Sequence, residues 1–426
     1  MVMDMKDVIA LVNTNRGNGK KESLNRMRIL LKKIGNPEQR LSFVHIAGTN
    51  GKGSTASFIS QILIQADLKT GIFTSPHLEK VNERIRINET YISDDDFIRT
   101  TGKVAAVVDA VEKECGERLY SFEILTAVAL LYYYEQKCDI VVLEAGIGGR
   151  LDATNTIPVP EVAIVTSIGM DHTKMLGETL EKISGEKAGI IKEKGDVVIP
   201  SFTPSIDDVF QKMSEDQQAS LHRVGTNDAQ DLIMTEQGST FSYKQFEKVT
   251  VRMVGKHQVS NALLAIEAAI ILKGKGYELS GEDIIRGIEA SYWPGRMEKI
   301  QDAPTIFIDG AHNPEGVERL RESIESLFPD EKLTIVVGMM KDKDYMRMID
   351  DILPYANKVY TVSPDPYRGF APRVVARQLQ EKGIDARPFD SIDDTVDFLK
   401  KQTDTNKKII VFGSLYLIGD IKKQWK

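Results

Sequence analysis

The stretch LSFVHIAGTNGKGSTASFISQILI, residues 41–64, carries the strongest fold signal in the chain. Its apolar first part predicts a buried strand, and its apolar last part predicts a helix. Three glycines, Lys52 and Ser54 lie between them. A loop that joins a buried strand to a helix directs backbone N–H groups and the positive end of the helix dipole at the turn. The stretch therefore indicates a loop that binds phosphate.

The spacing within this loop leaves a second interpretation open. Lys52 supplies a point charge that suits the outer phosphates of a nucleotide. The strict GxxxxGK[ST] pattern is not met, because Ile46 stands at the position of the first glycine and Gly53 follows Lys52. From this stretch alone, a structural glycine turn remains the alternative.

Strand-like and helix-like segments alternate through the first half of the chain. The strand-like segments are residues 41–48, 69–75, 138–149 and 161–169, and the helix-like segments are residues 52–68, 93–115 and 121–137. This alternation predicts an α/β fold with a mostly parallel sheet, in which ligands bind beyond the carboxyl ends of the strands.

The second half of the chain predicts another α/β domain. Residues 200–250 appear as polar, strand-like pieces, and residues 257–276 form a strong helical pattern with a glycine stop. The pattern then resets near WPGRMEK. Four strand-then-loop units follow, within residues 304–316, 331–345, 357–364 and 407–417. We therefore expect one domain at residues 1–296 and a smaller one at residues 297–426.

Composition limits the classes of function. The chain has 426 residues, 42% hydrophobic and 27% charged, with a net charge of −7. This charge argues against nucleic acid as a partner, because phosphate backbones need a basic face. No apolar stretch approaches the roughly 18 residues that span a bilayer, and Asp4 breaks any secretory signal. Cys115 and Cys138 show no spacing typical of a disulfide framework or a zinc site. We expect a cytoplasmic protein with no membrane contact.

Polar residues follow several predicted strands and converge on one edge of the expected sheet. These residues are Ser75, His77, Glu144, Asp152, Asp171, His172 and Lys187. Glu144 directly ends the apolar run IVVL, where a carboxylate is costly unless it meets a cation or a donor. Hydroxyl, carboxylate and imidazole groups beside phosphate suit a Mg²⁺ site. Taken singly, each residue has a milder interpretation as a turn, a hydrogen-bonded loop residue or a solvated side chain.

Ten segments in order along the chain resemble one family. They are GTNGKGS, TSPHL with NERI, EAGIGGRLDATN, DHTKMLG, GEKAGIIK, HQVSNALLA, WPGRMEK, DGAHNP, GMMKDKDY and FGSLYL. Together they are similar to the Mur-ligase-like family that contains folylpolyglutamate synthase and dihydrofolate synthase. This resemblance implies an N-terminal P-loop ATPase domain with a mostly parallel sheet and a smaller, Rossmann-like C-terminal α/β domain that serves as the glutamate-ligase domain.

The resemblance also implies roles for individual residues. The contacts to ATP fall on Thr49, Asn50, Gly51, Lys52, Gly53, Ser54, Asn261, Arg296 and Asp309. The ligands of two Mg²⁺ ions fall on Ser75, Glu144, His172 and an N6-carboxylated Lys187. The catalytic residues fall on Lys52, Lys187 and His312, and residues 75–84 would border the pterin.

The implied activity is an ATP-dependent ligase that adds L-glutamate to a reduced folate, such as tetrahydrofolate, through an acyl phosphate. The implied partners are small molecules only, and we expect a monomer. The alternatives are a dihydrofolate synthase that uses dihydropteroate, a bifunctional enzyme and a cell-wall Mur ligase. From other classes, the alternatives are a P-loop kinase or switch NTPase that makes no amide, and a nucleotide-binding module without activity.

Overall fold

The computed structural model describes residues 3–13, 23–341 and 344–425, which divide into two compact units. The first unit runs to Gln230 and also includes Ser242–Val249 and Ser260–Ser291. The second unit comprises Asp231–Phe241, Thr250–Val259 and the chain from Tyr292 onward. Two residues of the GMMKDKDY segment, Asp342 and Lys343, lie outside the described residues.

The first unit is built on an eight-stranded sheet with the order β4-β3-β2-β5-β1-β6-β7-β8. The six strands from β2 to β8 in this order are parallel, and β3 and β4 continue the sheet as antiparallel edge strands. The bounds are β1 (Phe43–Ala47), β2 (Thr70–Phe73), β3 (Ile85–Ile87), β4 (Thr90–Tyr91), β5 (Ile140–Glu144), β6 (Val162–Val165), β7 (Asp196–Pro200) and β8 (Ser220–Val224). Every residue of β1, β5 and β6 is buried, as expected for strands covered on both faces.

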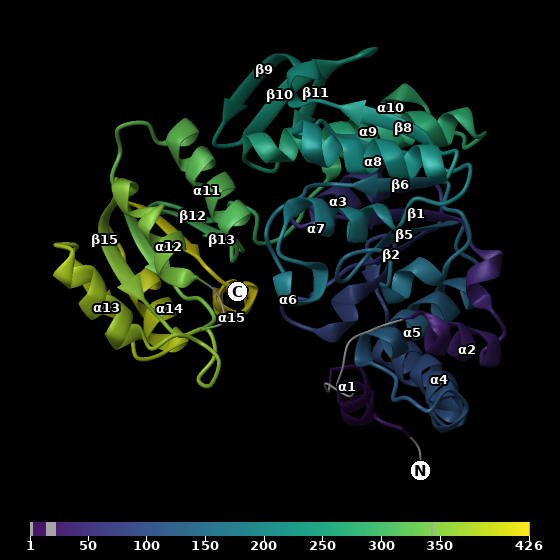
Figure 1. Ribbon diagram of the computed structural model, residues 1–426. Coiled ribbons are helices and arrows are strands. Elements are labelled where there is room, and N and C mark those ends of the chain that lie inside the picture. The colour runs from purple at the N-terminus through teal and green to yellow at the C-terminus, as the bar shows by residue number, and fades with distance from the viewer. Residues whose placement is uncertain (1–2, 14–22, 342–343, 426) are drawn as a thin grey trace. The chain divides into compact units, whose positions relative to one another are not determined.

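Helices pack on this sheet because its strands present apolar side chains in both directions. One core cluster joins Phe43 and Leu143 to α1, α2, α4 and α5, which lie together in the purple and blue part of Figure 1. The helices of this unit are α1 (Met5–Asn13), α2 (Asn25–Lys33), α3 (Lys52–Gln65), α4 (Asp94–Cys115), α5 (Ser121–Glu135), α6 (Thr173–Leu176), α7 (Leu180–Ala188), α8 (Pro204–Asp216), most of α9 (Lys256–Gly274) and α10 (Gly281–Ala290). Over the part of the chain that the structure describes, no helix has the length and apolar character needed to cross a membrane.

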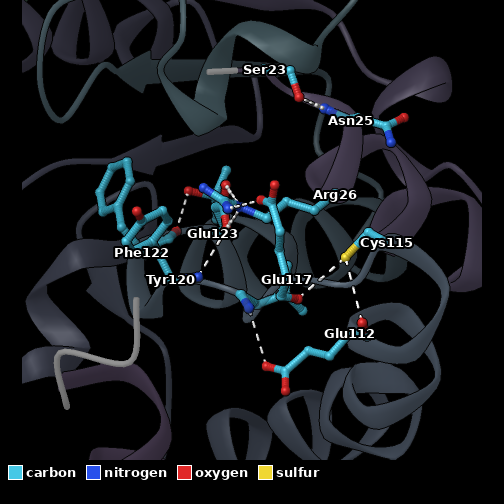
Figure 2. A network of polar contacts seen from close by, with 11 residues as sticks. Ser23, Asn25, Arg26, Glu112, Cys115, Glu117, Tyr120, Phe122 and Glu123 are labelled. Carbon is cyan, nitrogen blue, oxygen red and sulfur yellow. Dashed lines mark hydrogen bonds and ion pairs between the residues drawn. The ribbon is translucent and has the colours of Figure 1, made fainter. Parts of the chain in front are cut away.

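A buried ion pair fixes α2 against the start of α5 (Figure 2). Arg26 Nε lies 2.9–3.0 Å from the two carboxylate oxygens of Glu123, and its Nη1 contacts Glu117. The guanidinium carbon lies 4.3 Å from the centre of the Tyr120 ring. Arg26 is 7% exposed and Glu123 is fully buried. Burial lowers the pKa of Arg26, but the attraction and hydrogen bond of Glu123, together with Tyr120 and Glu117, outweigh burial, so the net pKa is raised.

Four neighbouring strands, β2, β5, β1 and β6, are parallel, so their carboxyl ends meet at one edge of the sheet. The loops that leave this edge contain the predicted phosphate loop and the residues Ser75, Glu144 and His172. The α/β fold and the mostly parallel sheet are confirmed, and the sheet order places the candidate residues where ligands of such folds bind.

Residues 200–250 are only partly strand-like, so the prediction for this segment was wrong at its start. The segment opens with α8, in which Ile206 and Phe210 lie on the buried face four residues apart. The strands follow it. After β8, a separate three-stranded sheet contains β9 (Gln230–Thr235), β10 (Gly238–Tyr243) and β11 (Phe246–Val251) in the order β11-β10-β9.

The second unit contains a six-stranded sheet with the order β12-β13-β17-β14-β15-β16. Only β12 is antiparallel to its neighbour. The bounds are β12 (Glu298–Asp302), β13 (Thr305–Asp309), β14 (Leu333–Val337), β15 (Ala356–Thr361), β16 (Ala386–Pro388), β17 (Lys408–Phe412), α11 (Pro314–Leu327), α12 (Tyr345–Asp350), α13 (Pro372–Glu381), α14 (Ile392–Lys400) and α15 (Leu415–Trp425). A single core cluster includes Phe307, Ile335 and Ile410 from the three central strands. The smaller C-terminal α/β fold is confirmed.

Candidate active site

The predicted phosphate loop lies between β1 and α3, and its backbone conformation requires glycine at two positions. Gly48 has φ +154° and Gly51 has φ +82°. A Cβ atom at Gly48 would lie 1.9 Å from Thr166 Oγ1, and one at Gly51 would lie 2.5 Å from Asn261 Oδ1. A side chain at either position would therefore clash with a neighbouring polar group as well as strain the backbone.

The first part of the loop is bound to the end of β6. The N–H groups of Thr49 and Asn50 donate to Ser167 O and Ser167 Oγ, both at 2.9 Å. Thr166 Oγ1 donates to Asn50 O at 2.6 Å. Helix α3 begins at Lys52, and the first N–H groups of any helix have no acceptor within that helix. The loop therefore directs the amide groups of its second part at the carboxyl edge of the sheet.

Lys52, Glu144 and Ser75 lie together at this edge. Lys52 Nζ donates to Gly48 O at 3.0 Å and to Thr49 O at 3.2 Å, and it lies 4.0 Å from Glu144 Oε1. Glu144 is 3% exposed, and its Oε2 accepts a hydrogen bond of 3.1 Å from the N–H of Ser75. The site therefore holds one positive and one buried negative group. The ammonium group could pair with a phosphate, and the carboxylate could pair with a cation.

One polar atom of the loop has no protein partner. Ser54 Oγ is buried at the start of α3 and has no hydrogen-bond partner among the described residues. Buried hydroxyl groups normally form hydrogen bonds, so this atom suits a ligand at the helix N-terminus. Hydroxyl and carboxylate oxygens are also the donors that Mg²⁺ prefers, so Ser54, Ser75 and Glu144 fit a nucleotide bound with Mg²⁺.

His172 lies in the loop after β6, which contacts the phosphate loop at Gly169. Thr49 Oγ1 exchanges hydrogen bonds with the Gly169 backbone, at 3.0 and 3.2 Å, which joins this loop to the phosphate loop. His172 lies three residues further on, with φ 50° and an exposed side chain, and its N–H donates to Asp171 Oδ1 at 2.9 Å. Over the described part of the chain, no group of three or more His, Cys, Asp or Glu residues could hold one metal ion. The assignment of His172 to Mg²⁺ therefore stays a prediction.

Lys187 is buried in α7, with an exposed fraction of 3%. The alternative of a solvated surface lysine is therefore wrong. The loop after Glu144 packs against this part of α7, because a Cβ at Gly149 would lie 2.9 Å from the carbonyl oxygens of Glu186 and Lys187. Arg150 N–H also donates to Glu186 O at 2.7 Å. The structure thus joins the turn of α7 that contains Lys187 to the loop that follows Glu144.

In the second unit, Asp309 orders the loop after β13. Its two carboxylate oxygens accept hydrogen bonds of 2.8 Å from Met297 N–H and Ala311 N–H. Burial raises the pKa of Asp309, although the charge of Arg296 acts in the opposite direction. The same unit contains Arg296, whose Nη1 donates to Gly295 O at 3.2 Å.

His312 follows Asp309 by three residues. Its Nδ1 lies 2.8 Å from Gly310 O. A carbonyl oxygen only accepts hydrogen bonds, so Nδ1 carries a proton and donates it to Gly310 O. Asn313 accepts a hydrogen bond of 2.8 Å from Gly316 N–H and so caps α11.

The sequence interpretation assigned no role to several residues that shape the site. Thr166 and Ser167 anchor the phosphate loop, and the only available signal was their place directly after the apolar run VAIV. Glu83 accepts hydrogen bonds of 2.6–2.8 Å from three successive N–H groups, those of residues 78–80, and so orders the loop that follows Ser75. Burial, together with the charge of Arg84, lowers the pKa of His77 in this loop to about 4.

Comparison with known proteins connects this geometry to a family. The Mur ligase middle domain matches residues 46–269, and the Mur ligase, glutamate ligase domain matches residues 295–415. The dihydrofolate synthase/folylpolyglutamate synthase of Bacillus subtilis is 36% identical over 419 residues, which cover 96% of each chain.

Solved structures agree with these sequence matches. The apo form of L. casei FPGS is 30% identical, with a TM-score of 0.86 and 99% of each chain covered. A solved FPGS-AMPPCP-folate complex is also 30% identical, with a TM-score of 0.85 and the same coverage. The chain therefore belongs to the Mur ligase family and, within it, to the folylpolyglutamate synthases and dihydrofolate synthases.

Proposed function

We propose that this protein is an ATP-dependent ligase that adds L-glutamate to folates through an acyl-phosphate intermediate. The observation that carries the proposal is the edge of the first sheet, where the loop before α3, Lys52 and the buried Glu144 converge. Relatives named for both folylpolyglutamate synthase and dihydrofolate synthase support it, as does a related structure with AMPPCP and folate.

The chemistry explains why such a site is needed. A folate carboxylate attacks the γ-phosphorus of ATP, and ADP leaves as the acyl phosphate forms. The glutamate amine then attacks the acyl carbon, loses a proton, and the tetrahedral intermediate expels phosphate. Negative charge gathers first on the transferred phosphoryl group and then on the tetrahedral oxygen, so fixed positive charge and N–H groups lower both barriers.

Each proposed residue has a part in this scheme. Lys52 and the N–H groups of residues 51–54 hold the phosphates, and Asn261, Arg296 and Asp309 complete the nucleotide contacts. Ser75, Glu144, His172 and an N6-carboxylated Lys187 would hold two Mg²⁺ ions, which supply further positive charge to the phosphate oxygens. His312, whose ring is oriented by the hydrogen bond from Nδ1 to Gly310 O, is the residue that we assign to the reaction centre.

We also propose the remaining properties that the sequence indicates. The two domains would comprise residues 1–296 and residues 297–426, and the second domain would help to attach glutamate. The protein would act as a cytoplasmic monomer on small molecules, without nucleic acid or membrane as a partner. Its net charge of −7 supports the absence of nucleic acid.

One experiment tests the activity. The purified protein is incubated with ATP, Mg²⁺, L-glutamate and either tetrahydrofolate or dihydropteroate, and the products are identified by mass. We expect the folate to gain one or more glutamyl residues, with one phosphate released for each. If dihydropteroate also gains the mass of a glutamyl residue, the enzyme is bifunctional. Phosphate release that does not depend on glutamate, or a product that carries phosphate in place of glutamate, would contradict the proposal and favour a kinase or NTPase.

A further inference from the structure

A buried chain of hydrogen bonds connects β1 to the loop that follows Glu144. His45 Nε2 lies 2.8 Å from Thr154 Oγ1, in the short helix η3 (Ala153–Thr156). Thr154 Oγ1 and Thr154 N–H donate to Asp152 Oδ1 at 2.6 and 3.0 Å. Asp152 Oδ2 accepts a hydrogen bond of 3.0 Å from Ile147 N–H. His45 and Thr154 are fully buried and Asp152 is 5% exposed, so water does not replace these bonds.

The direction of each bond follows from the groups involved. A carboxylate only accepts, so the single hydroxyl proton of Thr154 points at Asp152. Thr154 Oγ1 must then accept from His45, which fixes the ring as the neutral tautomer with its proton on Nε2. His45 Nδ1 is a buried atom without a hydrogen-bond partner among the described residues. In this tautomer Nδ1 is an acceptor, and burying an unpaired acceptor costs less free energy than burying an unpaired N–H donor. Burial, together with the charge of Lys192, lowers the pKa of His45 to about 3, in agreement with a neutral ring.

The hydrogen-bond chain ends at Ile147, in the tip of the loop that follows Glu144. The side chain of Ile147 is 37% exposed, and glycines flank it at positions 146 and 148. Gly146 and Gly148 lie close to the side chains of Phe122 and Leu176. The N–H of Ile147, three residues beyond Glu144, adds a directional restraint through its hydrogen bond to Asp152. At the other end of this series of hydrogen bonds, His45 pairs with Leu143 in the sheet. His45 also lies three residues before Gly48 of the phosphate loop.

We propose that His45 and Thr154 are positioning residues, which orient the Asp152 carboxylate and thereby hold the loop after Glu144 in register with the phosphate loop. They touch no reacting atom in this scheme. Without the hydroxyl donor, the Asp152 carboxylate would keep only the bonds from Thr154 N–H and Ile147 N–H, and the restraint on the tip at Ile147 would weaken. A displacement of about 1 Å at a reacting group can lower a rate about a hundredfold, so this restraint matters for turnover.

Two pairs of variants separate this role from a contribution to stability alone. Thr154→Val removes the hydroxyl at nearly constant volume, and Thr154→Ser keeps it. His45→Leu removes the donor, and His45→Gln keeps an N–H donor near the position of Nε2. Hydrogen exchange of the Ile147 amide is measured in each full-length variant, with amides of β7 as internal controls. Because one hydrogen bond contributes about 1 kcal/mol, we expect exchange at Ile147 to rise about fivefold to tenfold in Thr154→Val and His45→Leu. The two conservative variants should resemble the wild type.

Turnover is measured on the same proteins, below their unfolding temperatures. This arm rests on the ligase activity proposed above, and an inactive wild type would refute that activity while the exchange arm still tests the hydrogen-bond chain. We expect kcat of Thr154→Val and His45→Leu to fall about tenfold or more while KM for ATP changes by less than about threefold, with recovery in Thr154→Ser and His45→Gln. Unchanged exchange at Ile147 would overturn the proposal, and so would faster exchange with an unchanged kcat.

Discussion

Replacement of Arg26 by methionine should destabilise the first unit far more than the loss of a surface ion pair. The change removes the ion pair between Arg26 and the fully buried Glu123 (Figure 2). At the observed 2.9 Å, an effective dielectric constant of about 20 gives an attraction of about 6 kcal/mol, part of which offsets the desolvation of both groups. Removing one partner of such a pair typically costs about 3 to 5 kcal/mol.

Urea unfolding at pH 7 measures this loss. With a urea dependence of about 3 kcal/mol per molar, a loss of about 4 kcal/mol lowers the midpoint by about 1.3 M. The double variant Arg26→Met/Glu123→Gln removes both charges, so we expect it to be more stable than Arg26→Met alone. Arg99→Met is the matched control, because Arg99 is 40% exposed in its pairs with Asp96 and Glu135 and should lose at most about 1 kcal/mol.

The same variant should affect the site, because the ion pair positions the start of α5. Phe122 lies one residue before Glu123, and a Cβ at Gly146 would lie 2.7 Å from its ring. Gly146 is two residues beyond Glu144, so a shift of α5 reaches the loop at the sheet edge. The reasoning is refuted if Arg26→Met loses no more stability than Arg99→Met, or if the losses from Arg26→Met and Glu123→Gln simply add in the double variant.

Three further predictions address charge and protonation. Lys52→Ala should keep its fold by circular dichroism but lose about a thousandfold in ligation rate, because it removes charge from the phosphates; near-normal turnover at saturating ATP and Mg²⁺ would disprove this role. Lys187→Ala should lose most activity and regain part of it with added formate or acetate, which replaces a carbamate; full activity without either anion would rule out the carbamate. Burial lowers the pKa values of His45 and His257 to about 3, so only the unfolded chain takes up these protons as pH falls below about 6.5. Stability should therefore fall by about 2 kcal/mol for each histidine between pH 7 and pH 5, and urea unfolding of His45→Gln should show that the His45 share has disappeared.

The phosphate loop was predictable because its signal is local. An apolar strand, glycines and an apolar helix follow one another without interruption in residues 41–64, and the observed β1 and α3 fall within the predicted segments. The place of Glu144 was also accessible, because an acid at the end of a buried run needs a specific partner. The convergence of the loops then followed from the rule that parallel strands gather their carboxyl ends at one edge.

Other features depended on contacts that a single sequence does not display. Arg26 lies in a polar stretch, and its partner Glu123 is 97 residues away. The loop after Glu144 folds back onto the turn of α7 that contains Lys187, a contact that no local pattern displays. The missed helix α8 did carry a signal, since Pro204 at its start and the pair Ile206 and Phe210 fit a helix with one buried face. The many polar residues around that pair concealed it.

The contacts of Lys52 suggest how the phosphate loop can be ready before a nucleotide arrives. Its Nζ is held by two carbonyl groups of the loop itself and lies 4.0 Å from Glu144, so the ammonium and the buried carboxylate balance each other in the free protein. A triphosphate would offer Lys52 stronger, charged acceptors in place of the two neutral carbonyl groups. Mg²⁺ that entered with the nucleotide would add positive charge beside Glu144. The bond from Ser75 N–H and the anchors of the loop on Ser167 do not involve Lys52, so we expect them to remain when Lys52 turns to the phosphates, which leaves the loop preorganised for the charge that develops in the reaction.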